Sequence, residues 1–218
     1  MIREELIKKV ALKMDEISSS DDVIVSVDLS DNNPLYTQIN GLLNESINDV
    51  LTKAPIYRIT SFVSLIPSND IRVDNTEDGK RQIVVVKVPS DFIRIAAIND
   101  TLFKRPIVEV AIEGDETDKR QRNRFLMAKK SKPVAVIGRD EYGKRVITCY
   151  SYDLTDEPAP VASYVQRFAG ELDLYSEIPA DDYLADIISW TCAGRVFAAQ
   201  GDQVKGQLCD TNAAALMI

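Results

Sequence analysis

Apolar residues recur at helical spacing in the first fifty-five residues of the chain. Residues 3 to 17 are predicted to form a helix whose inner face carries Ile2, Leu6, Val10, Met14 and Ile17. A polar cluster at 18–22 ends this helix. Residues 23–33 are expected to form a connector with a short extended piece at 23–27.

A second helix is predicted to begin at Pro34, which suits the first helical position, with Asn33 as its N-cap. Its apolar stripe is broad and consists of Leu35, Ile39, Leu42, Leu43, Ile47, Val50 and Leu51. Pro55 fixes its end, because the residue before a proline avoids helical dihedral angles.

From residue 56 the pattern changes to the period of β-strands. Segments 71–73 and 83–88 flank the polar hexapeptide 74–79, which predicts a hairpin. Further strands are predicted at 92–98, 134–137, 146–152 and 161–168. Residues 115–132 are strongly polar and basic, and they are expected to form a long exposed loop or a short helix.

Helical patterning returns at the end of the sequence. Asp181 or Asp182 is expected to cap a helix that runs to about Gln200, with Leu184, Ile187, Ile188, Val196 and Phe197 facing inward. Gly201 and Asp202 interrupt the chain. A final helix from about Asp202 to Ala215 or beyond is expected to use Val204, Leu208 and Leu216 as its inner face.

This order of elements predicts an α+β fold. The N-terminal helices (1–55) and the C-terminal helices (171–218) are expected to form one helical core, because each has an apolar stripe to bury. The β-rich middle (56–170) is then an insertion into that core.

Composition and charge favour a globular protein with unevenly distributed charge. The 218 residues are 45% hydrophobic and 28% charged. The N-terminus is charged from its third residue, unlike a signal peptide, and apolar runs are far shorter than a membrane span of about 20 residues. The protein is therefore expected to be made and kept in the cytoplasm, or to be released only by lysis.

Residues 104–152 hold 12 basic and 7 acidic side chains (+5), whereas residues 153–218 hold 3 and 11 (−8). This asymmetry is explained either by complementary contacts between copies or partners, or by ordinary solvated surfaces.

Motifs with catalytic or metal-binding character are incomplete in this sequence. The chain has no histidine, and its three widely spaced cysteines fit buried free thiols better than a disulfide framework or a zinc site. Residues 138–145 resemble a P-loop, but Arg145 replaces the required Ser or Thr. The 74–79 loop resembles an EF-hand, but Thr76 and Val85 occupy ligand positions.

The adjacent acids Asp21-Asp22 and Asp181-Asp182 are explained as a polar linker and a helix cap. No catalysis, metal site or cofactor is expected.

Two segments remain candidates for binding. The first has eight basic residues and no acid, which favours contact with nucleic-acid phosphates, a solvated loop or an acidic neighbouring copy; its members are Lys119, Arg120, Arg122, Arg124, Lys129, Lys130, Lys132 and Arg139. Phe125 is its only aromatic residue, so stacking on bases is poorly supported. The second is the apolar end Leu216, Met217 and Ile218, which either completes its own helix or docks on a partner.

Three short stretches carry a resemblance to a known family: residues 51–55 (LTKAP), residues 88–94 (VPSDFIR) and residues 182–194 (DYLADIISWTCAG). They resemble head-to-tail connector (adaptor or ring) proteins of tailed bacteriophages, especially the tail-tubular type and its counterparts in crAss-like phages. The second is similar to an L-P-x-D-F-L-R element, with Ile93 in place of Leu. The likeness extends in layout over most of the chain, but its motifs are short.

The resemblance implies a structural virion protein without catalysis or cofactor. It implies a homo-oligomeric ring, commonly of twelve copies, between the portal protein and the next tail or ring protein. A DNA passage through the ring would give the basic segment a role, and portal contact would give one to the apolar end. The alternative function is a cytoplasmic nucleic-acid-binding or regulatory module that uses residues 119–139.

Overall fold

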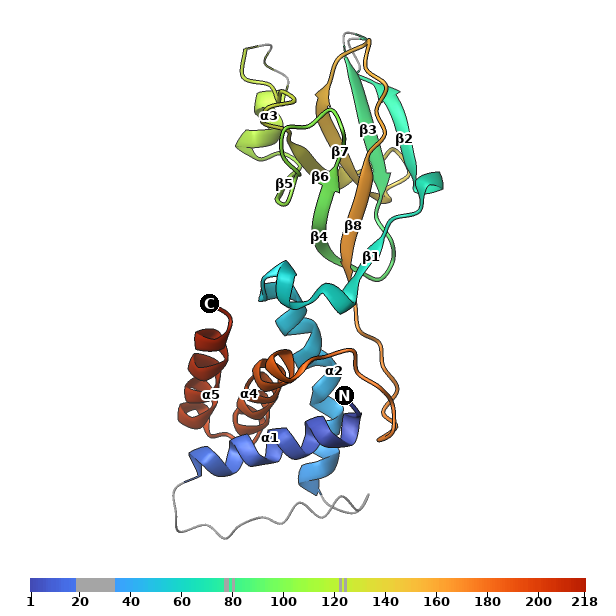
Figure 1. The fold of residues 1–218 in the computed structure, drawn as a ribbon. Coiled ribbons are helices and arrows are strands. Elements are labelled where there is room, and N and C mark those ends of the chain that lie inside the picture. The colour runs from blue at the N-terminus through green and yellow to red at the C-terminus, as the bar shows by residue number, and fades with distance from the viewer. Residues whose placement is uncertain (19–33, 77–78, 80, 122, 124) are drawn as a thin grey trace. The chain divides into compact units, whose positions relative to one another are not determined.

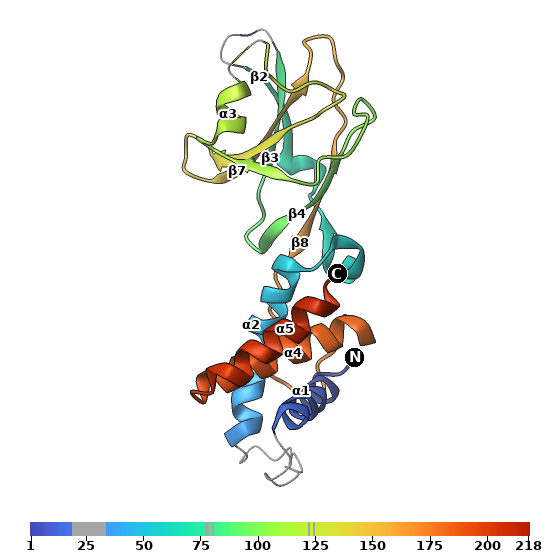
Figure 2. The same ribbon diagram turned by 90° about the vertical axis from the view of Figure 1, so that its left-hand side faces the viewer.

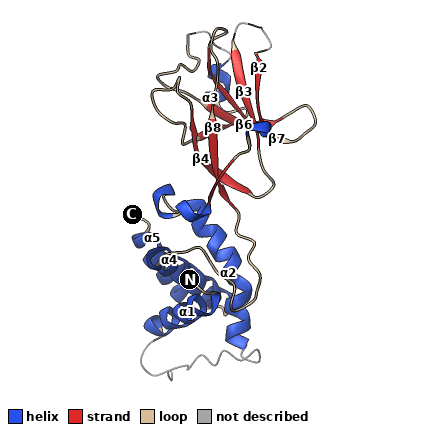
Figure 3. Ribbon diagram, turned by 45° about the vertical axis from the view of Figure 1, so that its right-hand side comes forward, coloured by secondary structure: helices blue, strands red, loops and turns tan. Residues whose placement is uncertain are grey.

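The computed structural model describes residues 1–18, 34–76, 79, 81–121, 123 and 125–218. The chain divides into two compact units: a helical unit of Met1–Phe62 and Arg167–Ile218, and a β unit of Val63–Gln166. Figure 3 shows helices in blue and strands in red. The fold is α+β, with N- and C-terminal helices flanking a β-rich middle, as predicted. The expected connector and the N-cap Asn33 lie outside the described residues.

The helical unit is built around one central helix. It contains α1 (Arg3–Ile17), α2 (Pro34–Lys53), α4 (Asp182–Ala199) and α5 (Gln203–Leu216), and α4 packs against the other three (Figure 1). Nearly the whole circumference of α4 is buried, as expected for a helix that is apolar on all sides. Its inward residues and its cap are confirmed: the Asp181 carboxylate accepts a hydrogen bond from the Leu184 backbone N–H at 2.8 Å.

The predicted inner face of the last helix is wrong. The side chains of Val204 and Leu208 are 78% and 49% exposed, and the buried residues of α5 are Gly206, Cys209 and Ala213. Figure 2 shows α4 and α5 side by side. A Cβ atom on Gly194 of α4 would lie only 3.2 Å from the carbonyl oxygen of Gly206. Because the two backbones approach this closely, only small side chains fit between them.

An extended segment between the last strand and α4 (residues 168–178, here called the strap) is tied to the first two helices. Asn40, Asn44 and Asn48 are four residues apart on one face of α2. Their side-chain amides donate to the carbonyl oxygens of Leu172, Gly170 and Phe168 at 3.1, 2.7 and 2.9 Å. The strap is thereby held along α2 through its backbone carbonyl groups.

The β unit contains two sheets. The first has the order β1-β8-β4 and the second the order β2-β3-β7-β6-β5, in which only β5 and β6 are parallel. The strands are β1 (Val63–Leu65), β2 (Ile71–Asn75), β3 (Gln82–Lys87), β4 (Phe92–Asn99), β5 (Val110–Ile112), β6 (Ala135–Arg139), β7 (Arg145–Tyr152) and β8 (Val161–Gln166). Both sheets contribute to one apolar core that includes Val86, Ile95, Ile147 and Tyr164.

The chain enters and leaves the β unit on neighbouring strands. The first strand, β1, pairs antiparallel with the last, β8, so that Val63 lies opposite Val165. The predicted strands are confirmed, although β8 ends at Gln166. The three-residue strands β1 and β5 were not predicted. Residues 115–132 contain the short helix α3 (Glu116–Gln121), one of the two predicted alternatives.

Candidate interaction surfaces

All three cysteines are free and buried, as the sequence analysis predicts. Burial raises the pKa of the Cys149 and Cys192 thiols to about 12 and that of Cys209 to about 11. A nucleophilic cysteine must be a thiolate, so these thiols are held in their unreactive form at neutral pH. Within the described ranges, no group of three or more potential metal ligands gathers, and no helix has the length and apolar character of a membrane span.

Both motif-like segments connect paired antiparallel strands, as predicted, although residues 77 and 78 of the second lie outside the described residues. In the P-loop-like segment, the Asp140 carboxylate accepts hydrogen bonds from the backbone N–H groups of Tyr142 and Lys144 at 3.0 and 2.8 Å. Gly143 has a φ of 76°, which favours glycine in this turn between β6 and β7. The 74–79 segment joins β2 to β3, whose pairing places Ile71 opposite Val86.

A buried acid that the sequence analysis did not single out lies in the β unit. One Asp100 carboxylate oxygen accepts hydrogen bonds from the Tyr152 hydroxyl at 3.1 Å and the Ala159 N–H at 3.0 Å, and the other accepts from the Leu102 N–H at 2.9 Å. Burial, with a smaller contribution from the hydrogen bond between Tyr152 and Asp100, raises the pKa of the Tyr152 hydroxyl. Since both oxygens bind the protein's own groups, Asp100 acts as a cross-link between strands and loops.

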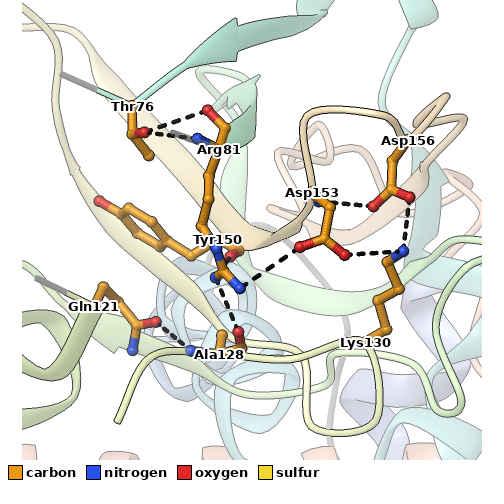
Figure 4. A network of polar contacts seen from close by, with 8 residues as sticks. All are labelled: Thr76, Arg81, Gln121, Ala128, Lys130, Tyr150, Asp153 and Asp156. Carbon is orange, nitrogen blue, oxygen red and sulfur yellow. Dashed lines mark hydrogen bonds and ion pairs between the residues drawn. The ribbon is translucent and has the colours of Figure 1, made fainter. Parts of the chain in front are cut away.

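The basic segment is anchored at its C-terminal half by a polar network (Figure 4). The Arg81 guanidinium donates to the carbonyl oxygens of Ala128 and Tyr150 at 3.1 and 3.4 Å and lies 3.8 Å from Asp153. The side-chain carbonyl of Gln121 accepts the Ala128 N–H at 2.9 Å. These bonds join the end of α3 to residue 128, so the intervening loop has a fixed base.

Lys130 belongs to the same network and is not available to a partner. Its ammonium group lies 2.6 Å from Asp156 and 3.2 Å from Asp153. The hydrogen bond from Lys130 lowers the pKa of the Asp156 carboxyl, and the same bond raises the pKa of Lys130. This lysine is a structural latch for the loop.

The remaining predicted basic residues differ in their surroundings. Arg120 is paired with Glu116 one turn earlier in α3, and Arg139 donates to the Gly143 carbonyl at 3.0 Å. Arg122 and Arg124 lie outside the described residues. Lys119, Lys129 and Lys132 are exposed, and no ion pair involves them within the described part of the chain.

The loop between α3 and the anchored residue 128 presents apolar side chains to solvent. Phe125 is 88% exposed and Leu126 is 60% exposed. In the sequence, the exposed Lys119 precedes them and the exposed Lys129 and Lys132 follow them. Residues 119–132 are called the basic tip below. An apolar centre with a cationic rim is a typical composition of a binding surface.

The apolar end of the chain is divided between its own fold and solvent. The helix α5 continues to Leu216, whose carbonyl oxygen accepts a hydrogen bond from the Tyr183 hydroxyl. Met217 lines a groove of about 380 Å³ between α2, α4 and α5, while Ile218 is 96% exposed. The first expectation therefore holds for Leu216 and Met217, which complete the helical unit, whereas Ile218 is exposed to solvent and docking on a partner stays a prediction.

The outer face of α5 also carries exposed apolar side chains. Val204, Leu208 and Ala215 are exposed and are spaced four and seven residues apart, which places them on one helical face; the exposed Ile218 follows the end of the helix at Leu216. This face lies opposite the buried Gly206–Ala213 face. Val204 and Leu208 of this face were predicted to lie in the core, together with the half-buried Leu216.

The strap is an exposed acidic segment that the sequence analysis had not identified as a surface. Glu171, Asp173 and Glu177 are exposed, and no ion pair involves their carboxylates among the residues that the structure describes. Leu172 and Tyr175, 58% and 73% exposed, lie between these acids. The three asparagines of α2 were the available signal, because asparagine is unfavourable inside a helix unless its side chain has a partner.

Comparison with known proteins gave no assignment: no family model matches the chain, and no curated protein is significantly similar to it.

Proposed function

We propose that this chain is a subunit of the ring that connects the portal to the tail in a tailed bacteriophage. It acts by docking, and neither catalysis nor a cofactor is part of the proposal. The observation that carries it is the pair of large apolar side chains Val204 and Leu208, which are exposed on the face of α5 opposite its buried residues Gly206, Cys209 and Ala213. Large exposed apolar residues on one face favour a protein partner.

In this proposal the α5 face and Ile218 contact the portal protein. The unit that carries them is assembled from both ends of the chain, and the β unit inserted between these two segments carries the basic tip. A subunit of a ring needs separate surfaces for its neighbours and for the components above and below it. The chain has candidate surfaces on both of its units.

Electron microscopy of the purified protein, alone and mixed with the portal protein of the same genome, tests the proposal. Rings with a central channel are expected in at least the mixture.

The double variant Val204→Asp with Leu208→Asp is expected to lose portal binding and keep its fold, because both residues are exposed. Val108→Asp, at an exposed apolar residue of the β unit, is the control. Monomers under both conditions would overturn the proposal. A monomer whose DNA affinity falls steeply with salt would support the nucleic-acid-binding alternative instead.

A further inference from the structure

The strap and the basic tip are complementary in composition. The strap (168–178) has three acidic residues and no basic residue, whereas the tip (119–132) has seven basic residues and no acidic residue. Each contains two exposed apolar residues, one aromatic and one leucine: Tyr175 and Leu172 in the strap, Phe125 and Leu126 in the tip. They belong to different units of the chain.

The strap and the base of the basic tip are each held in place by contacts within their own unit, before any partner binds. The carbonyl oxygens of Leu174 and Ser176 accept the backbone N–H groups of Glu4 and Arg3 at 3.0 Å, and these are N–H groups that the first turn of α1 leaves unpaired. The tip is closed at its base by the bond between Gln121 and Ala128 and by the Lys130 latch. Surfaces that are already ordered lose less entropy on binding than mobile ones.

The charges on the two surfaces are available. Glu171, Asp173 and Glu177 on the strap, and Lys119, Lys129 and Lys132 on the tip, are all exposed. Within the described residues none of the six takes part in an ion pair. By contrast, the neighbouring charges Arg120 and Lys130 already have carboxylate partners.

We propose that the strap of one copy binds the basic tip of a neighbouring copy. Phe125 and Leu126 pack against Tyr175 and Leu172, while the lysines of the tip surround them and face the carboxylates of the strap. The apolar centre supplies the contact that excludes water, and the charges set the pairing and its orientation.

A contact of this kind is heterologous, since the two surfaces differ. Each copy that binds through its tip still offers its strap, so the contact can repeat from copy to copy and closes into a ring if the rotation between copies allows it. The inference therefore deepens the proposed function by naming the surfaces between subunits. The contact between strap and tip rests on the proposed connector function only in the claim that the repeated contact closes into a ring.

Charge reversal on each surface tests the pairing. The strap variant is Glu171→Lys with Asp173→Lys, and the tip variant is Lys129→Glu with Lys132→Glu. Each alone is expected to weaken self-association at least about tenfold in sedimentation velocity, because like charges then face one another. The matched controls reverse two exposed charges elsewhere on the same unit: Asp15→Lys with Asp210→Lys, and Arg105→Glu with Lys144→Glu. These controls are expected to associate as the unaltered protein does.

Mixing the two defective variants is the decisive measurement. A strap that has become basic matches a tip that has become acidic, and the unaltered surfaces of the two variants also match each other. The mixture is therefore expected to regain the association that each variant lacks. Self-association of the unaltered protein should weaken as salt rises from about 50 to about 500 mM.

Three results would overturn the inference. One is an unaltered protein that stays monomeric over the whole concentration range at low salt. Another is a pair of variants that associate as well as their controls. The third is a mixture of the two variants that does not regain self-association, although each variant melts at the same temperature as the unaltered protein. That result is expected if the strap and the tip contact each other within a single chain.

These outcomes separate the inference from the function on which it builds. If unaltered rings form with the portal but are indifferent to the charge reversals, only the strap and tip assignment fails. If mixing restores association but the products are open chains that do not bind portal, the contact stands and the connector function fails.

Discussion

The helical unit is assembled from two segments separated by residues 63–166, whereas the β unit is one continuous segment. The helical unit has 9 basic and 18 acidic side chains, a net charge of −9, and the β unit has 17 and 16, a net charge of +1. Folding of the helical unit therefore requires two segments that are far apart in the sequence to pack together. Its excess of negative charge also has to be accommodated at its surface.

The difference teaches how an insertion of this size can be tolerated. Closing a loop of about a hundred residues costs on the order of 4 kcal/mol in chain entropy. Pairing of β1 with β8 brings the two ends of the insertion to adjacent strands, so folding of the β unit closes this loop for the helical unit. The β unit gains no comparable help from the helices, because its own chain is continuous.

This asymmetry gives the largest predicted effect. Ile147 in the β unit and Ile187 in the helical unit are both fully buried, and aspartate at either site buries an unpaired charge. Ile147→Asp is expected to unfold the β unit and, through the loss of loop closure, to destabilise the helical unit too. Ile187→Asp is expected to unfold the helical unit alone.

Thiol labelling with mass spectrometry distinguishes the two variants, because Cys149 lies in the β unit and Cys192 and Cys209 lie in the helical unit. Ile147→Asp should expose all three thiols, and Ile187→Asp should leave Cys149 protected. Leu12→Asp, at an exposed position of α1, is the control and should leave all three protected. Rapid labelling of Cys149 in the Ile187→Asp variant would show that the dependence also runs from the helices to the sheets.

A smaller effect is predicted for the close contact of α4 with α5. A Cβ atom at Gly194 would lie 3.0 to 3.2 Å from the Asp210 side chain, the Cys209 Cβ and the Gly206 carbonyl. Gly194→Ala is therefore expected to lower the free energy of unfolding by about 1–3 kcal/mol in urea titrations. The matched variant Gly41→Ala, in α2 with no atom within 4 Å, is expected to raise it by about 0.5–1 kcal/mol. If both substitutions changed the free energy of unfolding in the same direction, the packing described for α5 would be contradicted.

The smallest effect concerns the latch of the basic tip. Because Lys130 lowers the pKa of Asp156, this pair stabilises the fold above the ordinary aspartate pKa of about 3.9, and the stabilisation is lost as pH falls through the lower folded value. The pKa of Lys130 is raised above the ordinary lysine value of about 10.4. At alkaline pH the stabilisation is therefore lost only as the pH rises through this higher folded pKa.

An NMR titration of the Asp156 carboxyl carbon checks this prediction. The pKa is expected below the ordinary value in the unaltered protein and closer to it in Lys130→Met. Lys144→Met removes an exposed lysine of the β6–β7 turn and should leave the Asp156 titration unchanged. An Asp156 pKa that is unaffected by Lys130→Met would mean that another group sets it.

Much of the fold was predictable because its signals are local. The helix Arg3–Ile17 has the predicted boundaries, and Asp181 caps α4 as expected, since apolar periodicity and capping depend on neighbouring residues alone. The strands β1 and β5 escaped prediction, because three residues are too few to establish an alternating pattern. The basic tip was visible as a run of lysines and arginines, but the pairing of Lys130 with Asp153 and Asp156 required residues from another turn.

The sequence by itself determined most of the segments that form helices and strands, where most of these end, and that the middle of the chain is basic. Tertiary structure decided which face of α5 is buried: the close approach of Gly194 and Gly206 selected the small residues and left Val204 and Leu208 in solvent. It also decided that the strap is an ordered acidic surface, because its order comes from Asn40, Asn44 and Asn48 on a distant helix. Local pattern measures how apolar a residue is, whereas these outcomes depend on which backbones come close enough to touch.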